Sequence, residues 1–186
     1  MNHLSGECAQ ALANIRHLLD ESRWFPEYVF RGQWSRFFFF DSDWMFDPAF
    51  VERVQTLLKI DGGKCVCIAN FDRTVRRDDR LFFIDRHTPP VAYRELLCGA
   101  PPSEGWFTDI GRFGCCSDAD DWCMYSERAS EIAVIGIRSA ARVEQIRPVL
   151  TQFHAAPLAE AIADPPSYGF EVLSPQWRTE LLKQYG

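Results

Sequence analysis

The chain has 186 residues, of which 47% are hydrophobic, 14% aromatic and 25% charged, with a formal net charge of −6. These values describe a chain long enough to bury the core of one globular domain, and they exclude extended disorder. The acidic balance argues against a dedicated nucleic-acid-binding protein, which carries a basic footprint. It suits a basic protein partner, or it serves only to keep the chain soluble.

The sequence carries no targeting signal that we recognise. The N-terminal residues lack a cationic start and an uninterrupted apolar core, so we expect no secretory signal. No stretch approaches the roughly 20 apolar residues that span a bilayer. Seven cysteines, an odd number, argue against a disulfide framework. Together these features predict a soluble cytoplasmic protein that does not act at a membrane.

The first third of the chain predicts two helices and two strands. Apolar residues recur at helical spacing over residues 3–20. Two β-rich runs, Tyr28–Phe30 and Phe37–Phe40, follow with a polar link between them. Asp47–Pro48 provides a capping side chain and a first-turn proline, so a second helix begins here and ends near Gly62–Gly63.

Two further strands are predicted next in the chain. The run Lys64–Phe71 alternates as a strand and places Cys65 and Cys67 on one face. The segment Asp72–Arg80 carries charges of both signs, which is typical of an exposed turn. Leu81–Ile84 is then a short apolar strand.

A short helix is predicted from Pro89–Pro90 to about Gly99, and the glycine-punctuated stretch Trp106–Cys116 is predicted to be irregular. Near the C-terminus, apolar residues between Val143 and Phe153 have helical spacing. Pro148 is expected to kink or divide that helix because proline removes a backbone donor.

The segment Asp118–Arg138 predicts the centre of the sheet. An acidic loop leads into Trp122 and a short amphipathic strand, and a polar link, Glu127–Ser130, follows. The apolar run Ile132–Ile137 has the pattern of a strand buried on both faces. We expect the two strands to be neighbours.

The prolines of Asp164–Pro166 interrupt regular secondary structure. A final helix follows, and Ser174–Pro175 caps its start. No repeat, low-complexity tract or linker divides the sequence. The predicted fold is a single α+β domain over residues 1–186, with a largely antiparallel central sheet flanked by helices.

The cysteines raise the question of a metal site, since thiolates are ligands for zinc. The spacing argues against it, because Cys65 and Cys67 share a strand face and the adjacent Cys115 and Cys116 cannot easily bind one tetrahedral ion. Buried structural thiols fit the pattern better. Redox or nucleophilic use is the remaining alternative. We expect no metal and no cofactor.

Catalytic signatures are equally sparse. Of four histidines, only His87 has a suggestive carboxylate neighbour, Asp85, and no nucleophile motif accompanies it. We expect a non-enzymatic protein. The alternative is an enzyme of unrecognised type with a site around His87, Asp85 and the acidic loop.

Two acidic clusters with tryptophans are the candidate binding residues. Three interpretations are open: the carboxylates are solvated turn formers, they form a divalent-cation or acid–base catalytic site, or they belong to a protein contact with aromatic anchors and a charged rim. In the last case the partner-binding residues are Asp41, Asp43, Trp44, Asp118, Asp120, Asp121, Trp122 and Tyr125.

Two family resemblances can be stated on particular residues. The tetrapeptide Phe30–Gln33 matches the opening of the FRG domain, without the downstream pattern of that domain. The segment Asp120–Ile137 resembles the C-terminal strand pair of several families of bacterial immunity proteins. The likeness is carried by Trp122, Tyr125, Arg128 and Glu131 and by the apolar run Ile132–Ile137. This resemblance implies a protein that neutralises a cognate toxin by direct contact. The expected partner is therefore a protein toxin or effector.

Overall fold

The computed structural model describes the chain except residues 1–4, 73–80, 100–104, 107–110, 166–169 and 171–172. The described helices are α1 (Gly6–Leu18), α2 (Phe50–Asp61), α3 (Pro90–Cys98), α5 (Val143–Gln152), α6 (Leu158–Ala163) and α7 (Pro175–Tyr185). The strands are β1 (Arg36–Asp41), β2 (Cys65–Asn70), β3 (Leu81–Asp85), β4 (Arg112–Ser117), β5 (Trp122–Glu127) and β6 (Ile132–Ile137). Short 3₁₀ turns include η1 (Ser42–Met45) after β1. The predicted α+β fold is confirmed.

The six strands form one sheet in the order β1-β6-β5-β4-β2-β3, with every neighbouring pair antiparallel. The expected pairing of Trp122–Glu127 with Ile132–Ile137 is confirmed, and β6 is buried along its whole length. The strand β5 was expected to be amphipathic. This expectation is wrong, because β5 too is buried throughout.

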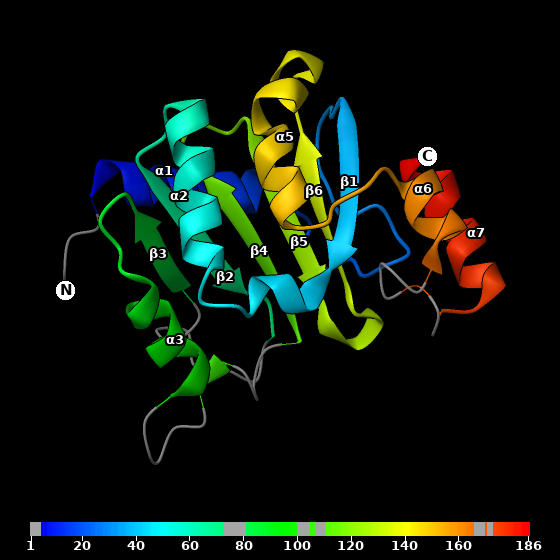
Figure 1. The fold of residues 1–186 in the computed structure, drawn as a ribbon, viewed down its shortest axis with the longest axis horizontal. Helices are drawn as coiled ribbons and strands as arrows, with labels where there is room; N and C mark the ends of the chain where they lie inside the picture. The colour runs from blue at the N-terminus through cyan, green and yellow to red at the C-terminus, as the bar shows by residue number, and fades with distance from the viewer. Residues whose placement is uncertain (1–4, 73–80, 100–104, 107–110, 166–169, 171–172) are drawn as a thin grey trace.

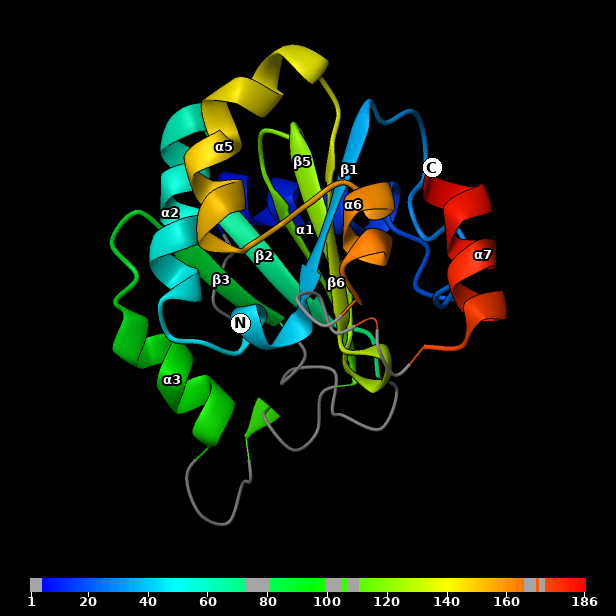
Figure 2. The same cartoon turned by 45° about the vertical axis from the view of Figure 1, so that its right-hand side comes forward.

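Helices cover both faces of the sheet. Figures 1 and 2 show α2 and α5 on one face, α1 on the opposite face, and α6 and α7 beside the β1 edge. The α2–α5 side holds one cluster of buried apolar residues, and the side with α1, α6 and α7 holds a second. Two buried layers explain why β4, β5 and β6 carry few exposed residues. In the described part of the chain, every helix is too short or too polar to traverse a bilayer.

Local signals placed most helix ends well. Ser5 and Ser174 cap α1 and α7, accepting hydrogen bonds from Cys8 N (3.3 Å) and Trp177 N (3.2 Å). The helix α2 ends at Gly62 in the left-handed conformation, with φ of 80°. The helix α5 continues through Pro148 rather than dividing there.

The sequence-based assignment of secondary structure was wrong or incomplete at several places along the chain. Residues 112–117, expected to be irregular, form β4. Residues 28–30 form no strand, and Phe30 makes only an isolated bridge with Leu19. The helix α6 was not predicted, and most of the charged turn expected at 72–80 lies outside the described residues.

Glycine explains why β4 was missed. A Cβ at Gly114 would lie 2.5 Å from Leu19 Cδ1 and 2.6 Å from Phe71 Cζ. The glycine that makes this sequence look irregular therefore allows two apolar side chains to lie directly on the strand.

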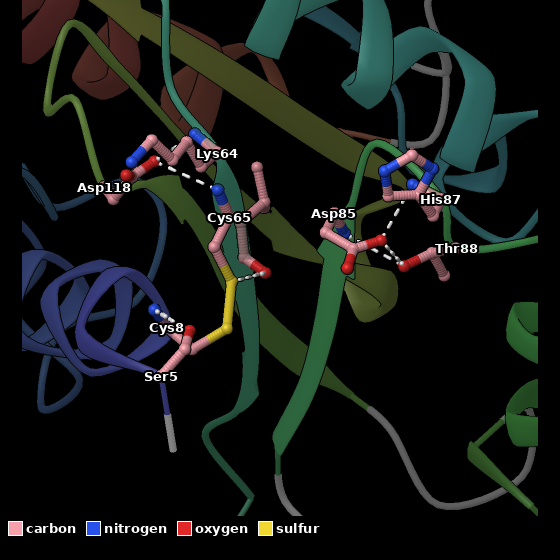
Figure 3. Close-up of a disulfide and its surroundings, with 9 residues drawn as sticks. Ser5, Cys8, Lys64, Cys65, Asp85, His87, Thr88 and Asp118 are labelled. Atoms are coloured by element: carbon pink, nitrogen blue, oxygen red, sulfur yellow. Dashed lines mark hydrogen bonds between the residues drawn. A yellow bond between two sulfur atoms is a disulfide. The ribbon is translucent and has the colours of Figure 1, made fainter.

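The cysteines also differ from expectation. Cys8 of α1 is bonded to Cys65 of β2, and Cys116 of β4 is bonded to Cys123 of β5, with Cα–Cα distances of 5.4 and 4.5 Å (Figure 3 shows the first). The expectation that the chain carries no disulfide framework is wrong, because sequence spacing does not show which cysteines meet. Cys67 is buried and free, and its burial raises the pKa of the thiol to about 12. No group of three His, Cys, Asp or Glu side chains in the described residues converges on a metal position.

Candidate functional site

The two acidic clusters lie at opposite ends of the sheet. Asp41 ends β1 opposite Ile132, whereas Trp122 begins β5 opposite Ile137, beside the acidic turn at 118–121. Five steps along β6, from 132 to 137, separate these positions, which corresponds to roughly 17 Å of strand. The predicted partner-binding residues therefore do not form one surface.

Two of the predicted contact residues are in the core. Trp122 is 2% exposed, and its Nε1 donates a hydrogen bond to Asp61 Oδ2 at 2.8 Å. Tyr125 is fully buried on the other face of the sheet, where its ring packs edge-on against Phe25 at 4.9 Å. The expectation that these rings lie at the surface is wrong, because the helices and the segment before β1 cover both sides of β5.

The acidic turn is occupied by contacts within the molecule. Asp118 Oδ1 accepts hydrogen bonds from the backbone N–H groups of Lys64 (2.8 Å) and Cys65 (3.1 Å), as Figure 3 shows. Asp120 pairs with Arg138 at 3.2 Å, and Asp121 pairs with Arg142 at 3.0 Å. These carboxylates tie the β4–β5 turn to its neighbours.

The other acidic cluster is partly accessible. Asp41 Oδ1 accepts a hydrogen bond from Asp43 N at 2.8 Å and so caps η1. Burial raises the pKa of Asp41, although that hydrogen bond lowers it. Trp44 is half-buried, stacks on the His154 ring at 5.1 Å, and lies 4.8 Å from the Arg53 guanidinium. Asp43 is exposed, whereas Asp41 and Trp44 are half-buried.

The alternative catalytic pair is held in a turn. Asp85 Oδ1 accepts hydrogen bonds from the backbone N–H of His87 (2.8 Å) and from Thr88 Oγ1 (2.9 Å) (Figure 3). Burial opposes ionisation of Asp85, but these hydrogen bonds outweigh it and lower its pKa. Asp85 lies opposite Cys65 and hence at the same end of the sheet as Asp118. The contact through His87 is a backbone contact, so it does not orient the imidazole.

The structure reveals a different site, a groove beside β1 that the sequence did not predict. A hollow of about 540 Å³ is walled by Tyr28, by Trp34–Phe37, by residues 157–159 and by residues 184–186. A second hollow, of about 650 Å³, shares Tyr28, Trp34 and Ser35 with the first. It continues to Gly32, Gln33 and Arg138. Together the two hollows form what we call the aromatic groove.

A glycine in β6 allows the rings of the groove to lie on the sheet. A Cβ at Gly136 would lie 2.9 Å from Phe30 Cε1 and 3.0 Å from both Phe37 Cε1 and Trp34 Cε3. Trp34 packs edge-on against Phe30 at 5.1 Å, and its Nε1 donates to the Arg31 carbonyl at 2.9 Å. Because Gly136 has no side chain, these rings can lie directly on β6, and this sets the depth of the groove.

The C-terminal helix forms the opposite wall. The Tyr185 hydroxyl donates a hydrogen bond to the Glu27 carbonyl (3.1 Å) and accepts one from Val29 N (3.0 Å). Its ring lies 5.1 Å from the Phe37 ring and 5.2 Å from the Tyr28 ring. Burial raises the pKa of Tyr185 far above its usual range, so the hydroxyl stays protonated. Tyr185 thus fixes α7 against the segment that carries the groove.

The charge of the groove differs from that of the chain as a whole. Among the described residues that line it, Arg36 and Arg138 are the charged side chains, and no aspartate or glutamate lines it. Arg138 lies 5.3 Å from the Trp34 ring and pairs with Asp120. Arg36 is exposed and has no carboxylate partner in the described part of the chain. A protein with a net charge of −6 therefore presents at this rim an exposed arginine, Arg36, that no described carboxylate neutralises.

The edge of the sheet is open where it meets the groove. Phe39 exchanges both backbone hydrogen bonds with Ala156, at 2.7 and 2.9 Å, and this is the one bridge on the outer edge of β1 among the described residues. The chain turns into α6 at Leu158, the residue that would lie opposite Phe37 if the ladder continued, so the pairing stops at Ala156. Strand alternation directs the N–H and C=O of Phe37 to the same outer side. These groups therefore face the groove without a strand partner.

Little in the sequence marks this site. Its rings come from Tyr28, Trp34, Phe37 and Tyr185, which the fold brings together from both ends of the chain. The closest local signal was the tetrapeptide Phe30–Gln33, whose last two residues line the groove. Gly32 makes the turn there with φ of 78°.

Comparisons with known proteins add no family assignment. The chain matches no protein-family model, and no curated protein or solved structure is significantly similar to it. The functional argument therefore depends on the geometry of the groove.

Proposed function

We propose that this chain is a non-enzymatic binding protein, and specifically an immunity protein that neutralises a cognate bacterial toxin by direct contact. The aromatic groove is the single observation that carries the binding function. Half-buried Tyr28, Trp34 and Phe37 line it, and Arg36 lies at its rim. Aromatic and arginine side chains in a partly desolvated hollow are typical of protein–protein hot spots.

The strand-pair resemblance supports the immunity role. The residues that carry it, Asp120–Ile137, lie in β5, β6 and the turns around them. Because most of these residues are buried, the strand pair acts as scaffold and the contact is made elsewhere. We place the contact at the groove, which adjoins β6 through Arg138 and Gly136.

Asp43 and Trp44, which the sequence also predicted to contact a partner, are exposed and half-buried respectively. They lie at the Asp41 end of β1, whereas the groove lies at the Arg36 end. One partner could contact both only if it followed the β1 edge along its full length. We therefore assign the contact to the groove.

Co-expression with the product of the adjacent gene tests the proposal. The expected result is rescue of growth when that product is toxic, together with co-purification of a stoichiometric complex. A catalytically inactive form of the toxin should bind equally well, because the proposed inhibition requires contact alone. Rescue without a complex, or a neighbouring product that is not toxic, would contradict the immunity role.

A further inference from the structure

We infer that the aromatic groove takes an extended, acidic segment of the partner protein, which adds as a short strand to the open edge of β1 at Phe37. This inference rests on the proposed binding function and specifies how the partner is recognised. It combines three observations: an unpaired strand edge, a cationic rim and accessible aromatic rings.

The edge provides the backbone contacts. Phe39 is already paired with Ala156, but the chain turns into α6 at Leu158 and leaves the space opposite Phe37 to the groove. In an antiparallel continuation of the bridge, the position opposite Phe37 would be residue 158, which instead begins α6. An incoming strand can occupy this place and satisfy the N–H and C=O of Phe37.

The rim selects the charge of the segment. Arg36 lies opposite Ile137 in the β1–β6 ladder, so it is at the same end of the sheet as Arg138. Arg138 is held by Asp120, whereas Arg36 is exposed and has no carboxylate partner among the described residues; its Nη1 donates only to the Ser35 carbonyl at 2.9 Å. A carboxylate on the incoming strand can pair with Arg36 in bidentate geometry.

The rings provide apolar contact for alternate side chains. A strand presents successive side chains to opposite sides. Side chains on one side of the added strand would pack on Trp34 and Tyr28, while those on the other side would reach the rim. The segment we expect therefore alternates acidic residues with β-branched or aromatic ones.

The test uses a short synthetic peptide of alternating glutamate and valine, with a lysine–valine peptide as the matched control. We expect the acidic peptide to bind and the basic peptide to fail to bind. Arg36→Glu should weaken binding of the acidic peptide at least about tenfold. The control variant, Arg94→Glu, changes an exposed arginine of α3 beside the opposite edge of the sheet and should leave binding unchanged (Figure 1).

Amide hydrogen exchange gives a backbone readout. Exchange at Phe37 N–H should slow at least about tenfold in the peptide complex, because that group gains a partner. Exchange at Phe39 N–H, which already bonds to Ala156, should change little. Binding that does not protect Phe37 would overturn strand addition, as would equal binding of the two peptides. Self-association of the protein through this edge, detected by sedimentation, would also overturn it.

These results separate the inference from the function on which it rests. If Arg36→Glu abolishes peptide binding but still rescues growth and co-purifies with the toxin, the partner binds elsewhere and only the inference fails. If the acidic peptide binds as expected and no neighbouring product is neutralised, the groove assignment stands and the immunity role fails.

Discussion

Arg112 and Glu127 lie directly opposite each other on β4 and β5, and both side chains are buried. Each holds the segment that precedes β1. Arg112 Nη1 donates to the carbonyls of Glu21 (3.2 Å) and Arg23 (3.1 Å), and Glu127 Oε2 accepts from Phe25 N at 3.1 Å. A buried pair on the central strands thus satisfies backbone groups of an irregular segment.

This pair also bears on the groove. The segment that it anchors continues to Tyr28 and Trp34, which form one wall of the groove. The Arg112 guanidinium lies 3.5 Å from the centre of the Trp24 ring, which covers it. The Tyr125 hydroxyl donates to Glu127 at 3.3 Å. The position of the groove wall therefore depends on a polar network inside the fold.

Removing Arg112 should destabilise the protein strongly. In Arg112→Met, Asp72 would lose its ion-pair partner, buried Glu127 would lose a nearby positive charge, and two carbonyls would lose their donor. We expect a loss of about 3–5 kcal/mol in the free energy of unfolding, measured by urea denaturation. The double variant Arg112→Met with Glu127→Gln should recover part of the loss. Arg94→Met, at an exposed site, is the control. Equal urea midpoints for Arg112→Met and Arg94→Met would refute the role given to Arg112.

The ionisation of Glu127 should lower the free energy of unfolding as the pH rises. Burial raises its pKa, while the hydrogen bonds from Phe25 and Tyr125 and the charge of Arg112 oppose the shift. The folded state therefore holds this proton more tightly than the unfolded state, and stability from this group falls as pH rises from about 4.5 through the folded pKa. Glu127→Gln cannot ionise. Its stability relative to the wild type should rise across that window and then level off, as unfolding measured at several pH values will show; a constant difference would contradict the shift.

Trp122 and Trp44 should respond differently to truncation. Trp122→Ala removes a buried ring and the donor to Asp61, so we expect a loss of about 3–5 kcal/mol. Trp122→Phe keeps much of the ring volume and should lose less. Trp44→Ala changes a half-buried ring and should leave a folded protein with a smaller loss. Thermal unfolding compares the three variants, and an unaltered melting temperature for Trp122→Ala would show that the ring does not stabilise the core.

The contrast between these tryptophans shows how far the sequence could predict the structure. Alternation and caps located most helices and strands, because those signals lie within a few residues of one another. The strand from Trp122 to Glu127 was placed correctly beside Ile132–Ile137, but its burial was not. Burial on both faces depends on which distant segments cover the sheet, and alternation along one strand does not contain that information.

The aromatic groove depends on contacts between residues that are even farther apart in the sequence. Phe37 and Tyr185 meet across most of the chain, at a ring distance of 5.1 Å. Their meeting follows from how α7 packs, and no local motif encodes it. The Cys8–Cys65 disulfide was missed for the same reason, since these cysteines are 57 residues apart.

Thiol counting tests the disulfides. In denaturant without reductant, an alkylating reagent should modify three cysteines, namely Cys67, Cys98 and Cys115. After reduction it should modify all seven, and mass spectrometry distinguishes the two results. The paired variant Cys8→Ser with Cys65→Ser should leave one disulfide and lower the free energy of unfolding by about 2–4 kcal/mol. Seven reactive thiols before reduction would show that neither bond forms.

Gly136 connects the core of the sheet with the aromatic groove. In Gly136→Ala, the new methyl group would meet the rings of Phe30, Trp34 and Phe37 at about 3 Å. We expect a loss of about 1–3 kcal/mol and weaker binding of the acidic peptide, because the rings must move outward into the groove. Gly6→Ala is the matched control, since a Cβ at Gly6 meets no described atom within 4 Å and alanine favours the first turn of α1. Urea denaturation and peptide titration of both variants measure the two effects. Full peptide affinity in a destabilised Gly136→Ala would show that ring position does not control the groove.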